Sequence, residues 1–302
     1  MKKKKAELTT QQIVLLIILI TSFAVILFLL FRLNLGETTS KEVCHNSVIL
    51  KGNSALAQEA VSLNCHTKYL CITADGSCEQ MTKPEIAKVK DKEELYKVLA
   101  DEMADCWWMF GEGKVDYVQS DMTKKLYCSI CSQIAFDDSL KKDEERYGIE
   151  NAKINQKDFY EYLADKKISK NEISYLEYLY GFNDLEEFEK YLNEIEKEFN
   201  NFDVNNQFYI IIGISSKIST LSWAVSGAGL GLAVFALTFT PLAPSVPFIV
   251  GAGLITTGGA TSTLVGITLK GLSGDEYLRP TIIEVNSDVF KSLKCEEILT
   301  FQ

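Results

Sequence analysis

The sequence contains few of the residues and motifs that most often carry out catalysis. Only two histidines occur among 302 residues, and no GxSxG, P-loop or HExxH motif is present. These absences remove the usual sequence evidence for a serine hydrolase, a phosphate-binding loop and a zinc protease. We therefore expect no catalytic residue, no cofactor and no metal site, and we predict that the protein is not an enzyme.

Basic residues are also fewer than acidic residues. The chain has 31 Lys and Arg against 41 Asp and Glu, which gives a net charge of -10, and the acidic excess is concentrated between residues 136 and 200. Binding nucleic acid requires a surplus of Lys and Arg on one face of the protein. We therefore exclude nucleic acid as a partner and predict an acidic surface.

Charge is absent from a long stretch near the N-terminus. This stretch follows Lys2 to Lys5 and has a nearly continuous apolar core at residues 13–31. Such a core is long enough, as a helix, to cross a hydrocarbon layer of about 30 Å. Because no small-residue cleavage site follows, we predict a retained transmembrane anchor over residues 1–35, with the N-terminus in the cytoplasm.

A second charge-free stretch, residues 218–269, has three of the five prolines near its middle. It predicts a lipid-embedded helical hairpin with helices at about 219–240 and 248–269, joined at Pro241, Pro244 and Pro247. A hairpin buried in a soluble core and a re-entrant loop are the alternatives. Small residues at four-residue spacing predict close helix packing; they are Gly227, Gly231, Gly258, Ser262 and Gly266.

All eight cysteines lie outside these apolar stretches, on the side of the membrane that we predict to be extracytoplasmic. An even number of cysteines outside the cytosol predicts up to four disulfides, one of them connecting the C-terminal tail to the main domain. The sequence does not determine the pairing. The candidates are Cys44, Cys65, Cys71, Cys78, Cys106, Cys128, Cys131 and Cys295.

Two local cysteine patterns allow other chemistry. Cys128 and Cys131 have the spacing of a zinc or redox pair, but on a strand residues three apart point to opposite faces, so we expect them to bond to different partners. The dipeptides Cys44-His45 and Cys65-His66 contain residue types that bind zinc or form a Cys–His nucleophile pair. We interpret both histidines as incidental neighbours of structural disulfides.

Hydrophobic periodicity predicts the elements between the apolar stretches. Strands are expected at 43–50, 68–73 and 126–136, and an amphipathic helix is expected at 184–199. Another helix begins at an Asp91 N-cap, with Glu94 completing a capping box, and ends at Gly111. Its apolar face is predicted to consist of Leu95, Leu99, Met103, Cys106 and Phe110.

These elements define an α+β fold. We predict a disulfide-rich extracytoplasmic domain at 36–217, the transmembrane helical hairpin at 218–269 and a tail at 270–302 that packs on the main domain. The ends of a hairpin lie close together, so the strand-like runs at 208–214 and 281–285 are expected to pair. The hairpin would then be an insertion into the sheet of the domain.

Two segments carry a resemblance. The stretches CWWMFGEG (Cys106 to Gly113) and CSICSQIAF (Cys128 to Phe136), together with CHNS at Cys44 and the Lys-led anchor, resemble membrane-anchored, cysteine-rich envelope proteins of small-genome archaea. The resemblance covers mainly residues 1–140. It implies an anchored cysteine-rich domain and gives no indication of an activity. The start of the chain is also similar to type IV pilin precursors, without their usual glycine.

The leading functional hypothesis is a membrane-anchored cell-envelope protein that is structural and not catalytic. Its expected partners are the lipid bilayer and a protein, or further copies of the chain, contacted through the membrane helices and the acidic external domain. One alternative is a membrane-active protein whose hairpin forms a pore or promotes fusion. The other is an extracytoplasmic thiol or zinc enzyme.

Overall fold

The computed structural model describes residues 14–23, 25, 39–53, 62–118, 126–168, 172–194, 199, 201–215, 234–235, 252–256, 264–270, 276–293, 295, 297–298 and 300. The chain divides into two compact units, Met1–Thr39 and Ser40–Gln302. Each is described separately below.

In the first unit, residues 14–23 and residue 25 are helical. Thr21 and Ser22 each donate a hydrogen bond from the hydroxyl to a carbonyl one turn earlier in this helix. Within the described parts of the chain, no helix combines the length and apolarity needed to cross a membrane. The predicted transmembrane anchor, and the membrane-anchored localisation that depended on it, are therefore wrong.

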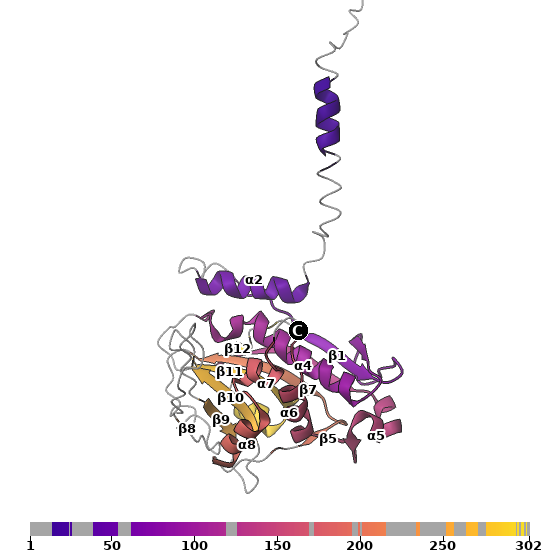
Figure 1. Ribbon diagram of the computed structural model, residues 1–302, viewed down its shortest axis with the longest axis vertical. Helices are drawn as coiled ribbons and strands as arrows, with labels where there is room; N and C mark the ends of the chain where they lie inside the picture. Colours follow the sequence, from indigo (N-terminus) through magenta and orange to yellow (C-terminus); the bar gives the residue numbers. More distant parts are fainter. Residues whose placement is uncertain are drawn as a thin grey trace, which may run out of the picture. The chain divides into compact units, whose positions relative to one another are not determined.

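The second unit is built on one large sheet and one small sheet (Figure 1). Along the large sheet the strand order is β2-β1-β3-β7-β11-β10-β9-β8, and β12 pairs with β3 beyond the end of β1. These strands are β1 (Lys68–Thr73), β2 (Glu85–Lys88), β3 (Leu126–Phe136), β7 (Phe208–Ser215), β8 (Val234–Phe235), β9 (Ala252–Thr256), β10 (Leu264–Lys270), β11 (Glu276–Glu284) and β12 (Glu297–Ile298). The small sheet has the order β4-β5-β6, with β4 (Ile149–Glu150), β5 (Lys153–Asn155) and β6 (Asn201–Asp203).

The predicted pairing of the two strands that flank the second apolar stretch is confirmed. Strands β7 and β11 are antiparallel, with Ile211 opposite Thr281 and Tyr209 opposite Ile283. On the other side, β7 is antiparallel to β3. The central strand β7 reads FYIIIGIS, a nearly continuous apolar run that suits a strand covered on both faces.

The predicted transmembrane helical hairpin is wrong. Where its second helix was expected, β9 is antiparallel to β10, and β10 is antiparallel to β11. An apolar run alone does not distinguish a helix from a buried strand, and β-branched residues such as Ile255, Val265 and Ile267 favour the strand. Gly266 lies in β10. The remaining residues named for hairpin packing and for the proline turn lie outside the described residues.

The helices of this unit are α2 (Ser40–Asn53), α4 (Lys92–Met109), α5 (Glu144–Tyr147), α6 (Gln156–Asp165), α7 (Tyr175–Tyr180), α8 (Leu185–Glu194) and α10 (Asp288–Ser292). Helix α4 begins as predicted, because the Asp91 carboxylate accepts a hydrogen bond from the Glu94 amide at 2.9 Å. The Glu94 carboxylate accepts from the Lys90 amide, one residue before the expected partner. All five residues of the predicted apolar face are buried.

The segment 43–50 is helical, and the prediction of a strand there is wrong. Helix α2 buries Cys44 and Val48, which are four residues apart and therefore lie on one helical face. The β-branched Val43, Val48 and Ile49 favour a strand locally. The packing of α2 on α4 and the disulfide from Cys44 to Cys65 determine the helical form.

The two faces of the large sheet are covered differently. Helices α4 and α7 lie over one face, and their side chains form a core with Ile210, Ile212 and Ile214 of β7 (Figure 1). Phe188 and Leu192 of α8 are also buried in this core, which confirms that the amphipathic helix packs on its own domain. On the other face, a smaller apolar cluster forms around Leu278 and Ile211.

Candidate functional site

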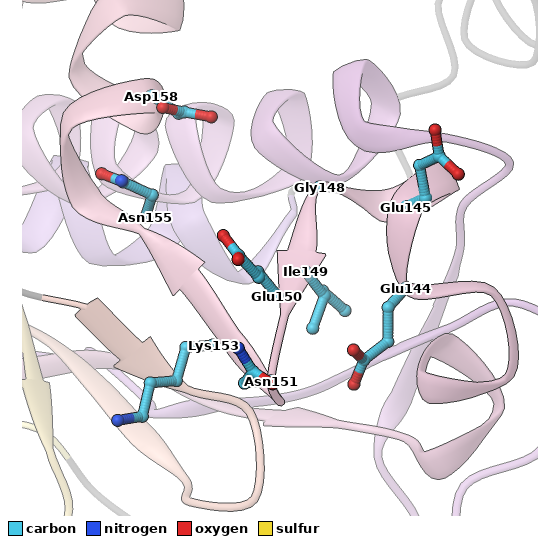
Figure 2. Close-up of a pocket in the computed structure, with 9 residues that line it drawn as sticks. All are labelled: Glu144, Glu145, Gly148, Ile149, Glu150, Asn151, Lys153, Asn155 and Asp158. Carbon is cyan, nitrogen blue, oxygen red and sulfur yellow. The ribbon is translucent and has the colours of Figure 1, made fainter.

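An open pocket of about 660 Å³ lies between the small sheet and the start of α6 (Figure 2). Its floor is the turn between β4 and β5, where Asn151 and Ala152 have φ of 52° and 58°. Two consecutive left-handed residues are what a tight antiparallel turn requires. Gly148, with φ 65°, ends α5 and leads into β4. Short turns therefore bring α5, β4, β5 and α6 around one hollow.

Four of the nine residues that line the pocket are carboxylates (Figure 2). They are Glu144 and Glu145 from α5, Glu150 from β4 and Asp158 from α6, and Lys153 is the one basic residue of the lining. Glu144 accepts a hydrogen bond from the Ala152 amide at 3.1 Å, which braces the turn. Asp158 forms an ion pair with Lys92 of α4 at 2.6 Å. Glu145 and Glu150 are exposed at the mouth of the pocket.

A second polar cluster lies at the carboxyl ends of the parallel strands β1 and β3. Asp137 follows β3 and is 4% exposed; its Oδ1 accepts hydrogen bonds from the Ser139 amide at 2.9 Å and from the Ser77 hydroxyl at 3.2 Å. The same hydroxyl lies 2.5 Å from Oδ1 of Asp75. The Ser139 hydroxyl accepts from the Ala74 amide at 3.0 Å. The two Asp-x-Ser segments thus join the ends of neighbouring strands.

Both carboxylates of this cluster are held in the charged form. Hydrogen bonds from the Ser77 hydroxyl and amide lower the pKa of Asp75 to about 2. Burial alone would raise the pKa of Asp137, but hydrogen bonds from Ser139 and Ser77 outweigh it and lower that pKa below its usual value. These bonds are all internal, so the cluster has the properties of a structural brace.

The eight cysteines form four disulfides, and none is free. The pairs are Cys44–Cys65, Cys71–Cys78, Cys106–Cys131 and Cys128–Cys295. Cys128 and Cys131 bond to different partners, as the strand geometry predicts, and Cys295 connects the tail to β3. A free thiol, which a thiol enzyme or a Cys–His nucleophile pair requires, is therefore not available.

The two histidines are not brought together as a metal site. The ring of His45 stacks on Trp108 at a centroid distance of 3.9 Å, and its Nδ1 lies 2.8 Å from the Trp108 carbonyl oxygen. Because a carbonyl only accepts, Nδ1 is the protonated nitrogen. Both neighbouring cysteines are in the same disulfide. Within the described residues, no group of three or more His, Cys, Asp or Glu is arranged to hold a metal ion.

One buried arginine has no carboxylate partner among the described residues. Arg279 of β11 is 4% exposed, donates to the Leu179 carbonyl at 2.8 Å and lies 5.9 Å from the centroid of the Trp107 ring. Burial lowers the pKa of its guanidinium to about 10. Its burial and its contacts with Leu179 and Trp107 make it part of the core.

Sequence reasoning did not single out the pocket residues or the strand-end aspartates. For the pocket, the available signal was the acidity of residues 136–200, which does not say which carboxylates converge. For the second cluster, it was the Asp-x-Ser pattern within two residues of the ends of two predicted strands. Searches of protein-family models, curated proteins and solved structures found no match to this chain.

Proposed function

We propose that the chain is a non-catalytic interaction protein whose acidic pocket binds a positively charged segment of a protein partner. The observation that supports this function is that four carboxylates and one lysine are among the nine residues that line an open hollow. Two of these carboxylates, Glu145 and Glu150, are exposed where a partner would enter.

Charge complementarity explains how such a pocket would select a partner. Lys and Arg side chains are attracted by clustered carboxylates, and a net charge of -10 adds a long-range attraction that speeds encounter with a basic partner. The hydrogen bond from the Ala152 amide to Glu144 and the ion pair of Asp158 with Lys92 hold two of the carboxylates in place before binding, which reduces the entropy lost in the complex.

Titration of the full chain with a short oligolysine peptide tests the proposal. We expect calorimetry to detect binding at low salt that weakens as the ionic strength rises, because exposed charges are screened. Replacing Glu145→Lys and Glu150→Lys together should weaken binding at least about tenfold, or about 1.4 kcal/mol.

The matched control carries Glu79→Lys and Glu186→Lys, two exposed positions outside the pocket with the same change in net charge. We expect this control to retain most of the affinity. If both double variants weaken binding equally, the peptide responds to net charge and the pocket is not the site.

A further inference from the structure

The described residues between Asp288 and Thr300, which follow β11, are called the tail below, and they lie on the face of the large sheet opposite to α4. On that face Leu126, Cys128, Ile211, Leu278 and Ile283 form an apolar cluster, and Leu293 of the tail is buried in it. Phe290 and Cys295 pack against the same cluster. The Phe290 ring of α10 also contacts the Tyr209 ring of β7 at 5.2 Å. Among the described residues, those of the tail therefore cover this apolar patch.

The described residues at the end of the tail are held by one short strand pairing and by the hydroxyl of Thr300. Strand β12 pairs with β3 over two residues, Glu297 opposite Tyr127 and Ile298 opposite Cys128. Beyond it, the Thr300 hydroxyl accepts a hydrogen bond from the Ile130 amide at 3.0 Å and lies 3.3 Å from the Thr67 hydroxyl. The disulfide from Cys128 to Cys295 is the one covalent connection between the tail and β3.

This disulfide is accessible from one side. Cys128 is fully buried, but Cys295 is partly exposed. Both cysteines of each of two other disulfides are at most 3% exposed, namely Cys44–Cys65 and Cys106–Cys131. Cys295 is therefore the end of this disulfide that lies nearer to solvent, and we expect a thiolate in solution to attack there before it attacks the two buried disulfides.

We propose that Cys128–Cys295 is a redox-sensitive latch, and that its reduction releases the tail and exposes the apolar patch on the sheet. A thiolate of a dithiol attacks Sγ of Cys295, the disulfide breaks, and Cys128 leaves as a thiolate that takes up a proton. The second thiolate of the dithiol then displaces Cys295 from the mixed disulfide. Two electrons and two protons pass from the dithiol to the two cysteines, and the dithiol becomes a disulfide.

Increasing concentrations of dithiothreitol, followed by alkylation and peptide mass spectrometry of the full chain, test the accessibility. We expect Cys128 and Cys295 to be alkylated at dithiothreitol concentrations that leave Cys44, Cys65, Cys106 and Cys131 oxidised. Reduction of Cys128–Cys295 only together with these buried disulfides would overturn the proposal.

Two matched double variants test the release of the tail without a reductant. Cys128→Ala with Cys295→Ala removes the latch, and Cys71→Ala with Cys78→Ala removes the other disulfide that has a partly exposed cysteine. Only the first should speed amide hydrogen exchange in residues 288–300 and increase the binding of a hydrophobic dye, each by several-fold. Wild-type exchange in the tail of the first variant would show that the disulfide is not a latch.

Discussion

Asp137 shows how a single buried carboxylate joins separate parts of the fold. Its Oδ1 accepts a hydrogen bond from the Ser139 amide, in the turn after β3. It also accepts one from the Ser77 hydroxyl, in the loop after β1. A buried carboxylate is tolerated only when hydrogen bonds replace the water it has lost. These hydrogen bonds therefore stabilise the ionised carboxylate of Asp137. They also connect the segments that follow β1 and β3.

Replacing Asp137→Ala should lower the free energy of unfolding by about 2–3 kcal/mol, because donors at Ser139 and Ser77 lose a charged acceptor. Urea denaturation followed by circular dichroism measures the change. The neighbouring Asp138→Ala provides the comparison, since the Asp138 side chain is 68% exposed and pairs with Lys141 at the surface; its effect should stay within about 0.5 kcal/mol. Equal effects at both positions would contradict the role assigned to Asp137.

At the scale of single elements, α4 connects sequence and structure most directly. Its N-cap, Asp91, has an extended backbone and accepts from the Glu94 amide. The helix then buries Leu95, Leu99 and Met103 against the sheet. One short polar side chain thus determines where an eighteen-residue helix starts.

Asp91→Ala should cost about 1 kcal/mol of stability, because one amide at the start of the helix loses its acceptor. Asp91→Asn retains an acceptor oxygen and should stay close to wild type. Thermal unfolding by calorimetry distinguishes the two variants. A stable Asp91→Ala protein would mean that packing of the apolar face alone determines the start of the helix.

The elements also show what the sequence could predict. Helix α4 and strand β3 were predictable because the apolar period, the cap and the local propensity agree. Helix α2 was not, because the Val43, Val48 and Ile49 side chains favour a strand, while the packing on α4 and the Cys44–Cys65 disulfide favour the helix. For residues 252–256 and 264–270, length and apolarity predicted helices where strands pair.

The candidate site was less accessible to prediction than the fold. Glu145 and Glu150 are two of many acidic residues in this part of the chain, and no local pattern distinguishes them. They meet because a turn with two left-handed residues and a glycine-capped helix bring α5, β4 and β5 together. Such convergence depends on tertiary geometry, which a single sequence does not show.

At the scale of the whole molecule, the core on the helical side of the sheet is rich in buried and partly buried tyrosines. Burial is the main cause that raises the pKa of Tyr160 and of Tyr162 to about 12, and it also raises the pKa of Tyr117 and Tyr180. In the unfolded chain these phenols ionise near pH 10. The folded state therefore retains protons that the unfolded state loses.

Stability should be insensitive to these tyrosines below about pH 10 and should fall as the pH rises from 10 toward 12. The sign follows because the unfolded state binds fewer protons than the folded state in that range. Rapid-mixing measurements of tyrosinate absorbance and far-ultraviolet circular dichroism should show late ionisation that coincides with unfolding. Complete ionisation with a midpoint near 10 and unchanged circular dichroism would show that these rings are accessible to solvent.

The connectivity of the disulfides affects how the molecule would respond to a protease. The loop closed by Cys106 and Cys131 contains Cys128, whose partner is Cys295, so the two closed loops overlap in the chain. One peptide-bond cleavage at any point between Cys106 and Cys295 leaves both fragments joined by at least one disulfide. A nicked protein would therefore remain a single covalent molecule until it met a reductant, and the two halves would separate only then.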